Sequence, residues 1–497
     1  MSGTAPDRVR ALITELAGRR SDWRLHRPST PRLPSSGPHL IGAAMVVVSV
    51  LVGWLAFSGT QGYSGAGFAL FIGSVSIMLM AWSNLLSTRV SALEQLFGGL
   101  DRMYRWHRWC GVLAVAAMWL HTQTADDDIK GIPGASKDVA EAATDLASTG
   151  TNMIYVLVGV SLLRWLPYRW WRLGHKLLGI PFAFACWHFY TAMKPFHNDS
   201  FWGRWFTGFM LLGIAGWLYR VVWRDMVRRG HDHRILNIER TGDTTVLNLE
   251  PIDRRLKHEA GQFAFVKARS SNLSEPHPFT IASAPDSPTL KFVIRDLGDW
   301  SARVGTHLSV GDRVTVEGPY GRLEPLPDDP ERPVLWIAGG VGITPFLGVI
   351  EAATRSQTNI PRLIFCARSR TDAPGLPDIE LAAEEGRIDL HLFISDEQCR
   401  LDSDALSRIV GDIASRDPHI VMCGPTGLVR QCRSILSHHG LTRIHVEEFD
   451  IRTGIGPDLS RQVDRILSRW VPSLDAKSVA ASAESDSPEP VTSHIDR

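Results

Sequence analysis

Four histidines in two apolar segments are the residues of this sequence whose spacing first points to chemistry. His107 and His121 lie fourteen residues apart in one segment, and His175 and His188 lie thirteen apart in another. On a helix, fourteen residues rise about 21 Å and bring the side chain back to within about 40° of its starting direction. Both imidazoles of the first segment would therefore point to one side, at two depths of a hydrocarbon layer about 30 Å thick.

The second pair predicts a local break in its helix. On an ideal helix, a spacing of thirteen leaves the second ring about 140° away from the first. Pro181 lies between the two histidines and removes one helical hydrogen bond. We therefore expect a distortion near Gly179–Pro181 that brings His188 back to the face of His175.

Paired imidazoles at matched depths can ligate metal macrocycles. An ionisable residue inside a membrane span is a functional candidate, and imidazole is a common axial ligand of haem. The alternative is a ring that only hydrogen-bonds a neighbouring backbone group, and it accounts poorly for four histidines at two depths. The sequence thus predicts metal ligation by His107, His121, His175 and His188, with each of two macrocycles held from both sides.

Six apolar segments predict the helices that carry these histidines. Each is long enough, or nearly so, to span a bilayer. Arginine is frequent in the loops at 88–105 and 164–172 and after residue 219, whereas the longest opposite loop contains Asp126–Asp128. By the positive-inside rule, both termini are cytoplasmic, and His107 and His175 lie near the cytoplasmic side. We expect a multi-pass protein of the plasma membrane. The predicted spans cover residues 39–58, 65–87, 104–124, 150–166, 173–193 and 201–223.

Composition limits the class of protein. A chain of 497 residues is too long for one domain and favours two or three. The net charge of +1 excludes a strongly basic nucleic-acid-binding protein. The 6 cysteines are scattered without the spacing of a metal site, so free thiols are expected. Residues 1–37 are basic and lack a cleavable apolar region, which indicates a cytoplasmic leader.

The second half of the chain is predicted to be soluble and to change its pattern near residue 330. Short alternating runs separated by Gly and Pro predict a small antiparallel β-barrel before that point. Buried strands that alternate with helices predict a doubly wound α/β domain with a parallel sheet after it. The expected domains are the leader 1–37, a transmembrane domain 38–225, a barrel 230–328, an α/β domain 330–450, and an amphipathic helix with a disordered tail at 451–497.

Two motifs in this half fit cofactors. In His277-Pro278-Phe279-Thr280, an aromatic ring and a hydroxyl side by side can pack against an isoalloxazine and hydrogen-bond its edge; a strand followed by a turn is the alternative. The segment from Gly339 to Pro345 joins a strand to a helix, where glycines let the backbone approach a pyrophosphate. It is not the G-x-G-x-x-G fingerprint, and a structural turn is the alternative. The positions concerned are Gly339, Gly340, Gly342, Ile343, Thr344 and Pro345.

Two further sites are weaker candidates. Cys423-Gly424-Pro425 follows another strand and ends at a turn that would face the cofactor; a core cysteine is the alternative. Arg368 and Arg370 follow the strand at 362–367 and can grip a ribose 2′-phosphate, or they can be solvated surface arginines.

With these motifs in place, residues 39–450 resemble the ferric reductase and NADPH oxidase superfamily. The resemblance implies a six-helix domain with two stacked haems b, a flavin-binding barrel and a ferredoxin-reductase-like nicotinamide domain. It pairs His107 with His175 at the inner haem and His121 with His188 at the outer one. The motif at 277–280 matches the family's flavin motif, and the glycine-rich and Cys423 segments match its nicotinamide site. Arg295, Gly298, Trp300 and Ser301 resemble its segment near the flavin phosphates.

Two features depart from the family pattern. The aromatic residue that shields the flavin corresponds to Phe449, which would act with Cys423 at the nicotinamide but is not terminal in this chain. No histidine follows shortly after His121, where the oxidases of the family carry one thought to help at the oxygen site. This second departure weakens oxygen as the dedicated acceptor.

The resemblance implies electron transfer from cytoplasmic NADPH, with NADH as an alternative donor, through FAD and the haems to an acceptor outside. We expect oxygen as that acceptor, giving superoxide. The first alternative is a ferric-chelate reductase, in which Asp126–Asp128 would attract a cation unless they only form a solvated loop. The second is a haem membrane subunit that feeds a partner reductase. The fused flavin and nicotinamide domains make a protein partner unnecessary, and the basic leader and tail leave room for a regulatory one.

Overall fold

The computed structural model describes residues 38–58, 65–124, 131–162, 168–223, 230–268, 273–353 and 360–446. Several predicted features lie outside these ranges: the basic leader, Asp126–Asp128, Phe449 and the segment 451–497. The described residues all belong to one compact unit that begins at Pro38.

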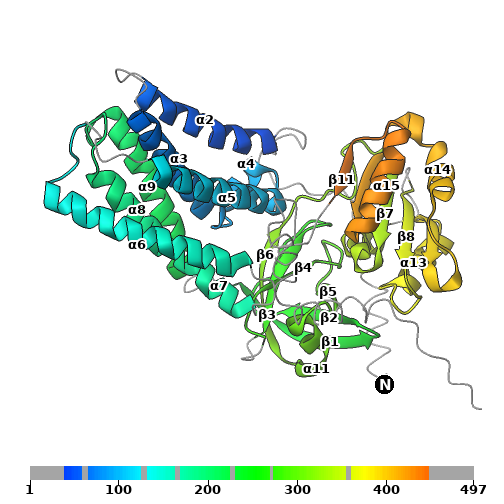
Figure 1. Cartoon of the computed structure of the whole chain (residues 1–497). Helices are drawn as coiled ribbons and strands as arrows, with labels where there is room; N and C mark the ends of the chain where they lie inside the picture. Colours follow the sequence, from blue (N-terminus) through cyan, green and yellow to red (C-terminus); the bar gives the residue numbers. More distant parts are fainter. Residues whose placement is uncertain are drawn as a thin grey trace, which may run out of the picture. The chain divides into compact units, whose positions relative to one another are not determined.

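The first half of the described chain is a group of helices (Figure 1). Large apolar side chains on several of them are exposed, including Leu51, Val156 and Leu211. An exposed apolar surface of this extent is typical of a membrane-facing or partner-facing region. The helices are α2 (Pro38–Ser58), α3 (Gly65–Leu86), α4 (Ser91–Phe97), α5 (Leu100–Thr124), α6 (Lys137–Leu162), α7 (Tyr168–Leu177), α8 (Gly179–Thr191), α9 (Phe201–Leu218) and the π-helical turn η1 (Tyr219–Trp223).

Three helices within the described residues are long and apolar enough to cross a membrane. They are Leu40–Ser58, Gly67–Leu86 and Phe201–Trp223, which correspond to the first, second and sixth predicted spans. The third predicted span falls on α5, whose first turns carry several arginines. The fourth falls on α6, which begins at Lys137 instead of residue 150 because the segment before 150 is rich in Ala, which favours helix.

The fifth predicted span is broken in two. Helix α7 ends at Leu177 and α8 begins at Gly179, with Leu178 between them. The prediction of a distortion near Gly179–Pro181 is therefore confirmed. Proline has no N–H to continue the hydrogen-bond ladder, which explains why the helix breaks one turn before Pro181.

The next domain is a six-stranded antiparallel sheet with the order β4-β3-β6-β1-β2-β5. An isolated bridge between Ile281, just after β4, and Phe292 in β5 links the two edges of this sheet. The motif His277–Thr280 forms β4 and pairs with β3, with Phe263 opposite Thr280 and Phe265 opposite Pro278. The elements are β1 (His231–Thr241), β2 (Thr244–Pro251), β3 (Phe263–Ala268), β4 (His277–Thr280), β5 (Leu290–Arg295), α11 (Asp299–His307) and β6 (Arg313–Tyr320).

The last domain is a parallel five-stranded sheet with the order β11-β10-β7-β8-β9. The chain runs outward from the central β7 to β9 and then returns to β10, so the strand order reverses between β7 and β10. Ligands of such sheets bind at this switch point, beyond the carboxyl ends of the strands. The elements are β7 (Val334–Gly339), η2 (Gly340–Ile343), α12 (Thr344–Ala352), β8 (Arg362–Ala367), α13 (Leu376–Glu384), β9 (Asp389–Ile394), η3 (Ser395–Glu397), α14 (Ser403–Gly411), η4 (Ala414–Arg416), β10 (His419–Cys423), α15 (Thr426–His438) and β11 (Ile444–Val446).

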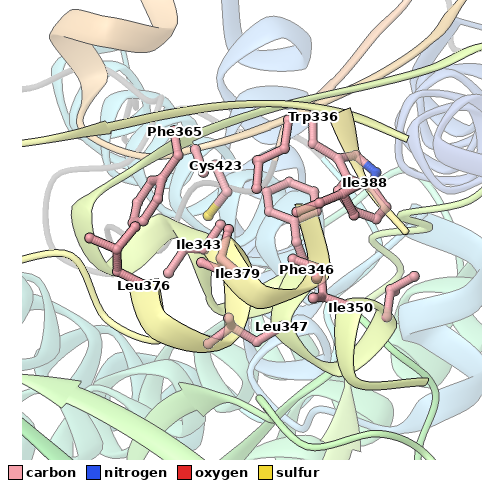
Figure 2. Packing of buried hydrophobic residues seen from close by; sticks show 14 of the residues in the cluster. Trp336, Ile343, Phe346, Leu347, Ile350, Phe365, Leu376, Ile379, Ile388 and Cys423 are labelled. Carbon is pink, nitrogen blue, oxygen red and sulfur yellow. The ribbon is translucent and has the colours of Figure 1, made fainter. Parts of the chain in front are cut away.

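A dense apolar core supports the parallel sheet (Figure 2). Trp336 of β7 packs against Phe346 of α12 with ring centroids 5.1 Å apart. Ala282, which follows β4, and Val293 of β5 belong to the same cluster of buried residues. The two sheets therefore share a core. This shared core fixes the motif at His277–Thr280 relative to the glycine-rich segment at Gly339–Pro345.

Candidate functional site

The imidazoles of His107 on α5 and His175 on α7 lie side by side, with their ring planes at 70° to each other. Their ring centroids are 5.8 Å apart. A metal–imidazole bond is about 2 Å long, so two axial rings on one ion lie about 6 Å apart between centroids. Within the described residues no group of three or more His, Cys, Asp or Glu side chains could hold a bare ion. Two imidazoles at this separation fit a metal that brings its remaining ligands with it, as haem iron does.

Backbone carbonyls of α3 determine which ring nitrogen is available. The Nδ1 atom of His107 lies 2.8 Å from the carbonyl oxygen of Ser83, and the Nδ1 atom of His121 lies 2.9 Å from that of Ala69. A carbonyl can only accept, so each Nδ1 carries the proton and donates it. Each Nε2 is then the lone-pair nitrogen, which is the arrangement found in most histidines that ligate a metal.

A constant register between α3 and α5 produces both contacts. Midway between them, the hydroxyl of Ser76 donates to the carbonyl of Ala114 at 2.8 Å. Ala69, Ser76 and Ser83 follow one another at seven-residue intervals, which places them on one face of the helix. The sequence prediction did not include these three residues, although small residues at this spacing in an apolar segment would have identified the face.

The other two histidines are oriented differently. The Nδ1 atom of His188 lies 3.3 Å from the hydroxyl oxygen of Thr144 on α6. The buried Nδ1 of His175 has no hydrogen-bond partner among the described residues, and its ring instead stacks on Trp171 at 5.1 Å and 10°. Trp171 is held in turn because its indole N–H donates to the carbonyl of Ser161 at 3.0 Å. All four predicted ligands therefore have defined orientations.

An aromatic stack surrounds the predicted flavin motif. Trp300 lies 4.6 Å from His277 and 5.5 Å from Phe279 between ring centroids, and both pairs are stacked. Thr280 is 5% exposed at the end of β4. Burial, with a smaller effect from the positive charge of Arg172, lowers the pKa of His277 to about 4. His277 is therefore neutral at physiological pH and can stack or accept a hydrogen bond.

The phosphate-side residues of the predicted flavin site lie next to the nucleotide loop. Arg295 ends β5, and its Nε donates to Asp243 at 2.8 Å. The hydroxyl of Ser301 accepts from the N–H of Gly298 at 3.1 Å and so caps α11. A Cβ placed on Gly340 would lie 3.6 Å from Nη1 of Arg295. The sequence motifs near residues 295–301 and 339–345 are therefore brought together.

The glycine-rich loop lies at the switch point of the parallel sheet. Gly340 adopts a φ of +52°, a left-handed conformation that favours glycine. A side chain on Gly342 would collide with the carbonyl oxygen of Cys423, so this glycine allows the loop after β7 to approach the loop after β10. Thr344 and Pro345 open α12, whose N-terminus favours a phosphate. Gly339 and Gly424 are in close contact in the same place, next to Pro425.

Cys423 lies in the apolar core of the parallel sheet, with Ile343 and Phe365 close by (Figure 2). It is 2% exposed. It ends β10, as the sequence predicts, while its burial fits a packing role. Phe449, its predicted partner, lies outside the described residues, so a role for this pair stays a prediction.

Arg368 and Arg370 follow β8 as predicted, but their surroundings differ. Arg370 donates to Glu397 at 2.9 Å and to Glu380 at 2.8 Å. These hydrogen bonds raise the pKa of the Arg370 guanidinium and engage its donors. Arg368 is 4.0 Å from Asp396 and 68% exposed, so it is the more available of the two for a phosphate.

Three segments of the chain match known protein families. Residues 72–186 match the ferric reductase like transmembrane component, residues 233–324 match an FAD-binding domain, and residues 336–434 match the oxidoreductase NAD-binding domain. The first match contains three of the four predicted haem ligands, and His188 follows it by two residues. Together with the three helices of spanning length, it identifies a membrane protein.

Individual relatives are similar over parts of their length. The chain is 25% identical to the 2-halobenzoate 1,2-dioxygenase electron transfer component of Burkholderia cepacia over 221 residues, which are 43% of this chain and 65% of that protein. It is 33% identical to NADPH oxidase 1 of Mus musculus over 113 residues, 22% of this chain and 19% of that protein. It is also 33% identical to ferric reduction oxidase 2 of Arabidopsis thaliana over 141 residues, 26% of this chain and 19% of that protein.

The chain thus spans less than two thirds of the length of each of these relatives. The family assignment depends instead on the order of the three matched domains along one chain, from membrane component to FAD-binding to NAD-binding domain. With similarity to both an NADPH oxidase and a ferric reduction oxidase, this order makes the chain a member of the ferric reductase and NADPH oxidase superfamily.

Proposed function

We propose that this protein transfers electrons from cytoplasmic NAD(P)H, through FAD and two haems b, to an acceptor on the outer side of the membrane. The observation that carries the proposal is the closely spaced pair His107 and His175, 5.8 Å apart between ring centroids, in a chain with FAD- and NAD-binding domains. FAD takes up a hydride and releases single electrons, and haem carries electrons one at a time.

The protein's own residues divide this work between its domains. The loop at Gly339–Pro345 and the N-terminus of α12 would bind the nucleotide phosphates. Strand β4, with its stacked Trp300, would hold the flavin. His107 with His175 would hold the inner haem, and His121 with His188 the outer one.

A six-helix membrane domain is part of the same proposal. Helices α5, α6 and α8 are less apolar than the three span-length helices, yet they expose large apolar side chains such as Leu113, Trp119, Val156 and Trp187. Side chains of this kind are suited to a lipid environment. The arginines at the start of α5 would then lie at the cytoplasmic surface, together with both termini.

Oxygen is the acceptor that we propose, with superoxide as the product. His121 and His188 would both be bound to the outer haem, so the acceptor would be reduced there without binding to the iron. A ferric chelate can be reduced in the same way. The similarity to a ferric reduction oxidase favours this second candidate.

The test uses the purified full-length protein with NADPH or NADH, first without and then with an acceptor. Without an acceptor, either nucleotide should reduce both haems. With oxygen, superoxide should form faster than a ferric chelate is reduced under nitrogen, and the opposite order supports the ferric reductase. Failure of both nucleotides to reduce the haems without an added protein would contradict the proposal in favour of a partner-dependent subunit.

The haem assignment has its own test. Replacing His121 or His188 with Ala should remove one haem, because both residues would be needed to hold it. Reduction of a dye that accepts electrons from the flavin should be unchanged, because the dehydrogenase half is intact. Retention of both haems in the His121→Ala protein would refute this ligand pairing.

A further inference from the structure

A buried polar network connects the helices to the antiparallel sheet, and no predicted motif accounts for it. On the helical side it contains Arg89, Glu94 and Tyr104; on the sheet side it contains Phe265, Glu317, Tyr320 and Gly321. We call these seven residues the joint. Arg89 is 9% exposed and Glu94 is 7% exposed, which is unusual for charged side chains.

Arg89 lies at the centre of the joint. Its Nε donates to the hydroxyl of Tyr104. Its guanidinium carbon lies 3.9 Å from the centroid of the Phe265 ring, within the range of a cation–π interaction. Arg89 also adopts a left-handed φ of 56°, which only a specific set of contacts would maintain in a residue other than glycine.

Glu94 makes a second connection between the same two parts. One carboxylate oxygen of this α4 residue accepts the backbone N–H of Gly321 at 3.1 Å. Burial raises the pKa of Glu94, against the opposing effects of this hydrogen bond and of Arg322. Next to Gly321, the hydroxyl of Tyr320 donates to Glu317 at 2.8 Å.

Apolar packing makes the joint continuous. Phe263, Phe265 and Tyr320 of the sheet belong to one buried cluster with side chains from α3, α4 and α5. Burial on this scale fixes the position of the sheet relative to the helices, because protein interiors pack as densely as organic crystals. The helical members of the cluster include Leu79, Trp82, Leu86, Phe97, Leu100, Met103 and Cys110.

The joint ends at the two predicted cofactor sites. On the sheet side, Phe265 is the direct β-ladder partner of Pro278, within the motif proposed to hold the flavin. On the helical side, Tyr104 lies one turn before His107, with ring centroids 6.3 Å apart. The chain of contacts therefore runs from the flavin motif through Phe265, Arg89 and Tyr104 to a proposed ligand of the inner haem.

We propose that Arg89 and Glu94 are positioning residues that fix the distance between the flavin site on β4 and the inner-haem site at His107. The inference rests on the proposed function, since the distance matters only if electrons cross it. Among the described residues, the hydrogen bonds of these two side chains go to Tyr104 and to the Gly321 backbone, and not to the nucleotide loop or to His107. They act through the placement of the two domains.

The first experiment compares Arg89→Asn, Arg89→Lys and the exposed control Arg430→Asn in the full-length protein. Asparagine tolerates the left-handed backbone, so the substitution removes the guanidinium without adding strain. Flavin reduction by NAD(P)H and the following haem reduction are timed separately without oxygen. We expect flavin reduction at the wild-type rate and haem reduction slowed roughly tenfold or more in Arg89→Asn, since small misplacements are costly. Arg89→Lys should be intermediate because it keeps the charge.

The second experiment needs no bound cofactor. Glu94→Gln keeps an oxygen that can accept the Gly321 N–H, whereas Glu94→Leu removes it. Hydrogen exchange at the Gly321 amide should be faster in Glu94→Leu and close to wild type in Glu94→Gln. If Arg89→Asn does not fold, Phe265→Leu removes the same cation–π contact from the sheet side and should slow haem reduction alone.

The outcomes separate the joint from the proposed function. Haem reduction at the wild-type rate in Arg89→Asn or Phe265→Leu would overturn the proposal. So would an equal slowing of flavin and haem reduction, since a positioning role affects only the second step. If NAD(P)H does not reduce the haems of the wild-type protein, the proposed function fails. The rate of hydrogen exchange at the Gly321 amide then still tests whether Glu94 holds the antiparallel sheet against the helices.

Discussion

At the scale of single residues, one carbonyl oxygen decides which nitrogen a histidine can offer to a metal. The carbonyls of Ser83 and Ala69 accept from the Nδ1 atoms of His107 and His121, which leaves Nε2 as the basic nitrogen. Gly73 is needed for the second of these contacts. A Cβ at this position would lie 2.9 Å from Nδ1 of His121, closer than side chains normally approach.

Gly73→Ala should therefore displace the His121 ring and weaken the outer-haem site. We expect loss of most of one haem per protein, measured by the haem-to-protein ratio and by the reduced-haem spectrum. The matched control is Gly67→Ala on the same helix, where a Cβ would meet nothing within 4 Å. An unchanged haem content in Gly73→Ala would contradict the ligand assignment of His121.

A second residue-scale prediction concerns pH. The pKa of His277 falls from 6.5 to about 4 through burial and then Arg172. Between these values the unfolded chain binds a proton that the folded chain does not, so His277 makes the free energy of unfolding decrease as pH falls from 6.5 towards 4. We expect His277→Gln to remove on the order of 1–3 kcal/mol of this pH dependence. Thermal unfolding across this range measures it, with the exposed His307→Gln as control.

At the scale of elements, the break between α7 and α8 is stabilised by a neighbouring helix. The indole N–H of Trp217 on α9 donates to the carbonyl of Lys176 at 2.8 Å, next to the end of α7. The ring of Trp217 also occupies the space that a side chain on Gly179 would need. The break therefore requires both a proline that interrupts the ladder and a glycine that admits Trp217.

Gly179→Ala should force Trp217 away and disturb the orientation of His175 relative to His188. Overpacking of this kind typically lowers the free energy of unfolding by about 1–3 kcal/mol. We expect a lower Tm and reduced haem content, measured by thermal unfolding and haem absorbance. Gly174→Ala is the control, because a Cβ there would make only an ordinary contact, 3.8 Å from Leu157. Equal effects of the two substitutions would show that Trp217 does not support the break.

At the scale of the whole molecule, the proposed function requires the donor and the acceptor to meet opposite sides of the membrane. Cys399 offers a direct test of this orientation because it is exposed, whereas Cys110, Cys186, Cys423 and Cys432 are buried. A membrane-impermeant maleimide should label the protein in inverted vesicles and not in intact cells. Cys399→Ser should lose the label. Labelling in intact cells would place the dehydrogenase half outside and contradict the proposed direction of electron flow.

Local pattern was sufficient for much of this molecule. The predicted strand at 362–367 matches β8 residue for residue, because buried parallel strands are short runs of apolar residues with clear ends. Pro181 was sufficient to predict the break after α7, because proline removes a helical hydrogen bond within one turn of its own position. The spacing of His107 and His121 predicts one face for both rings, since helical periodicity determines which side chains share a face; their role as metal ligands stays a prediction.

Tertiary structure decided what depends on partners distant in the chain. The register of α3 against α5 selects Ser83 and Ala69 as the acceptors for the histidines. Glu380 and Glu397 engage Arg370, which the sequence prediction assigned to a phosphate. The contact of Arg89 with Phe265 joins residues separated by most of the membrane domain. Spacing along a chain specifies direction within one helix or strand, but the choice among partners follows only from packing those elements together.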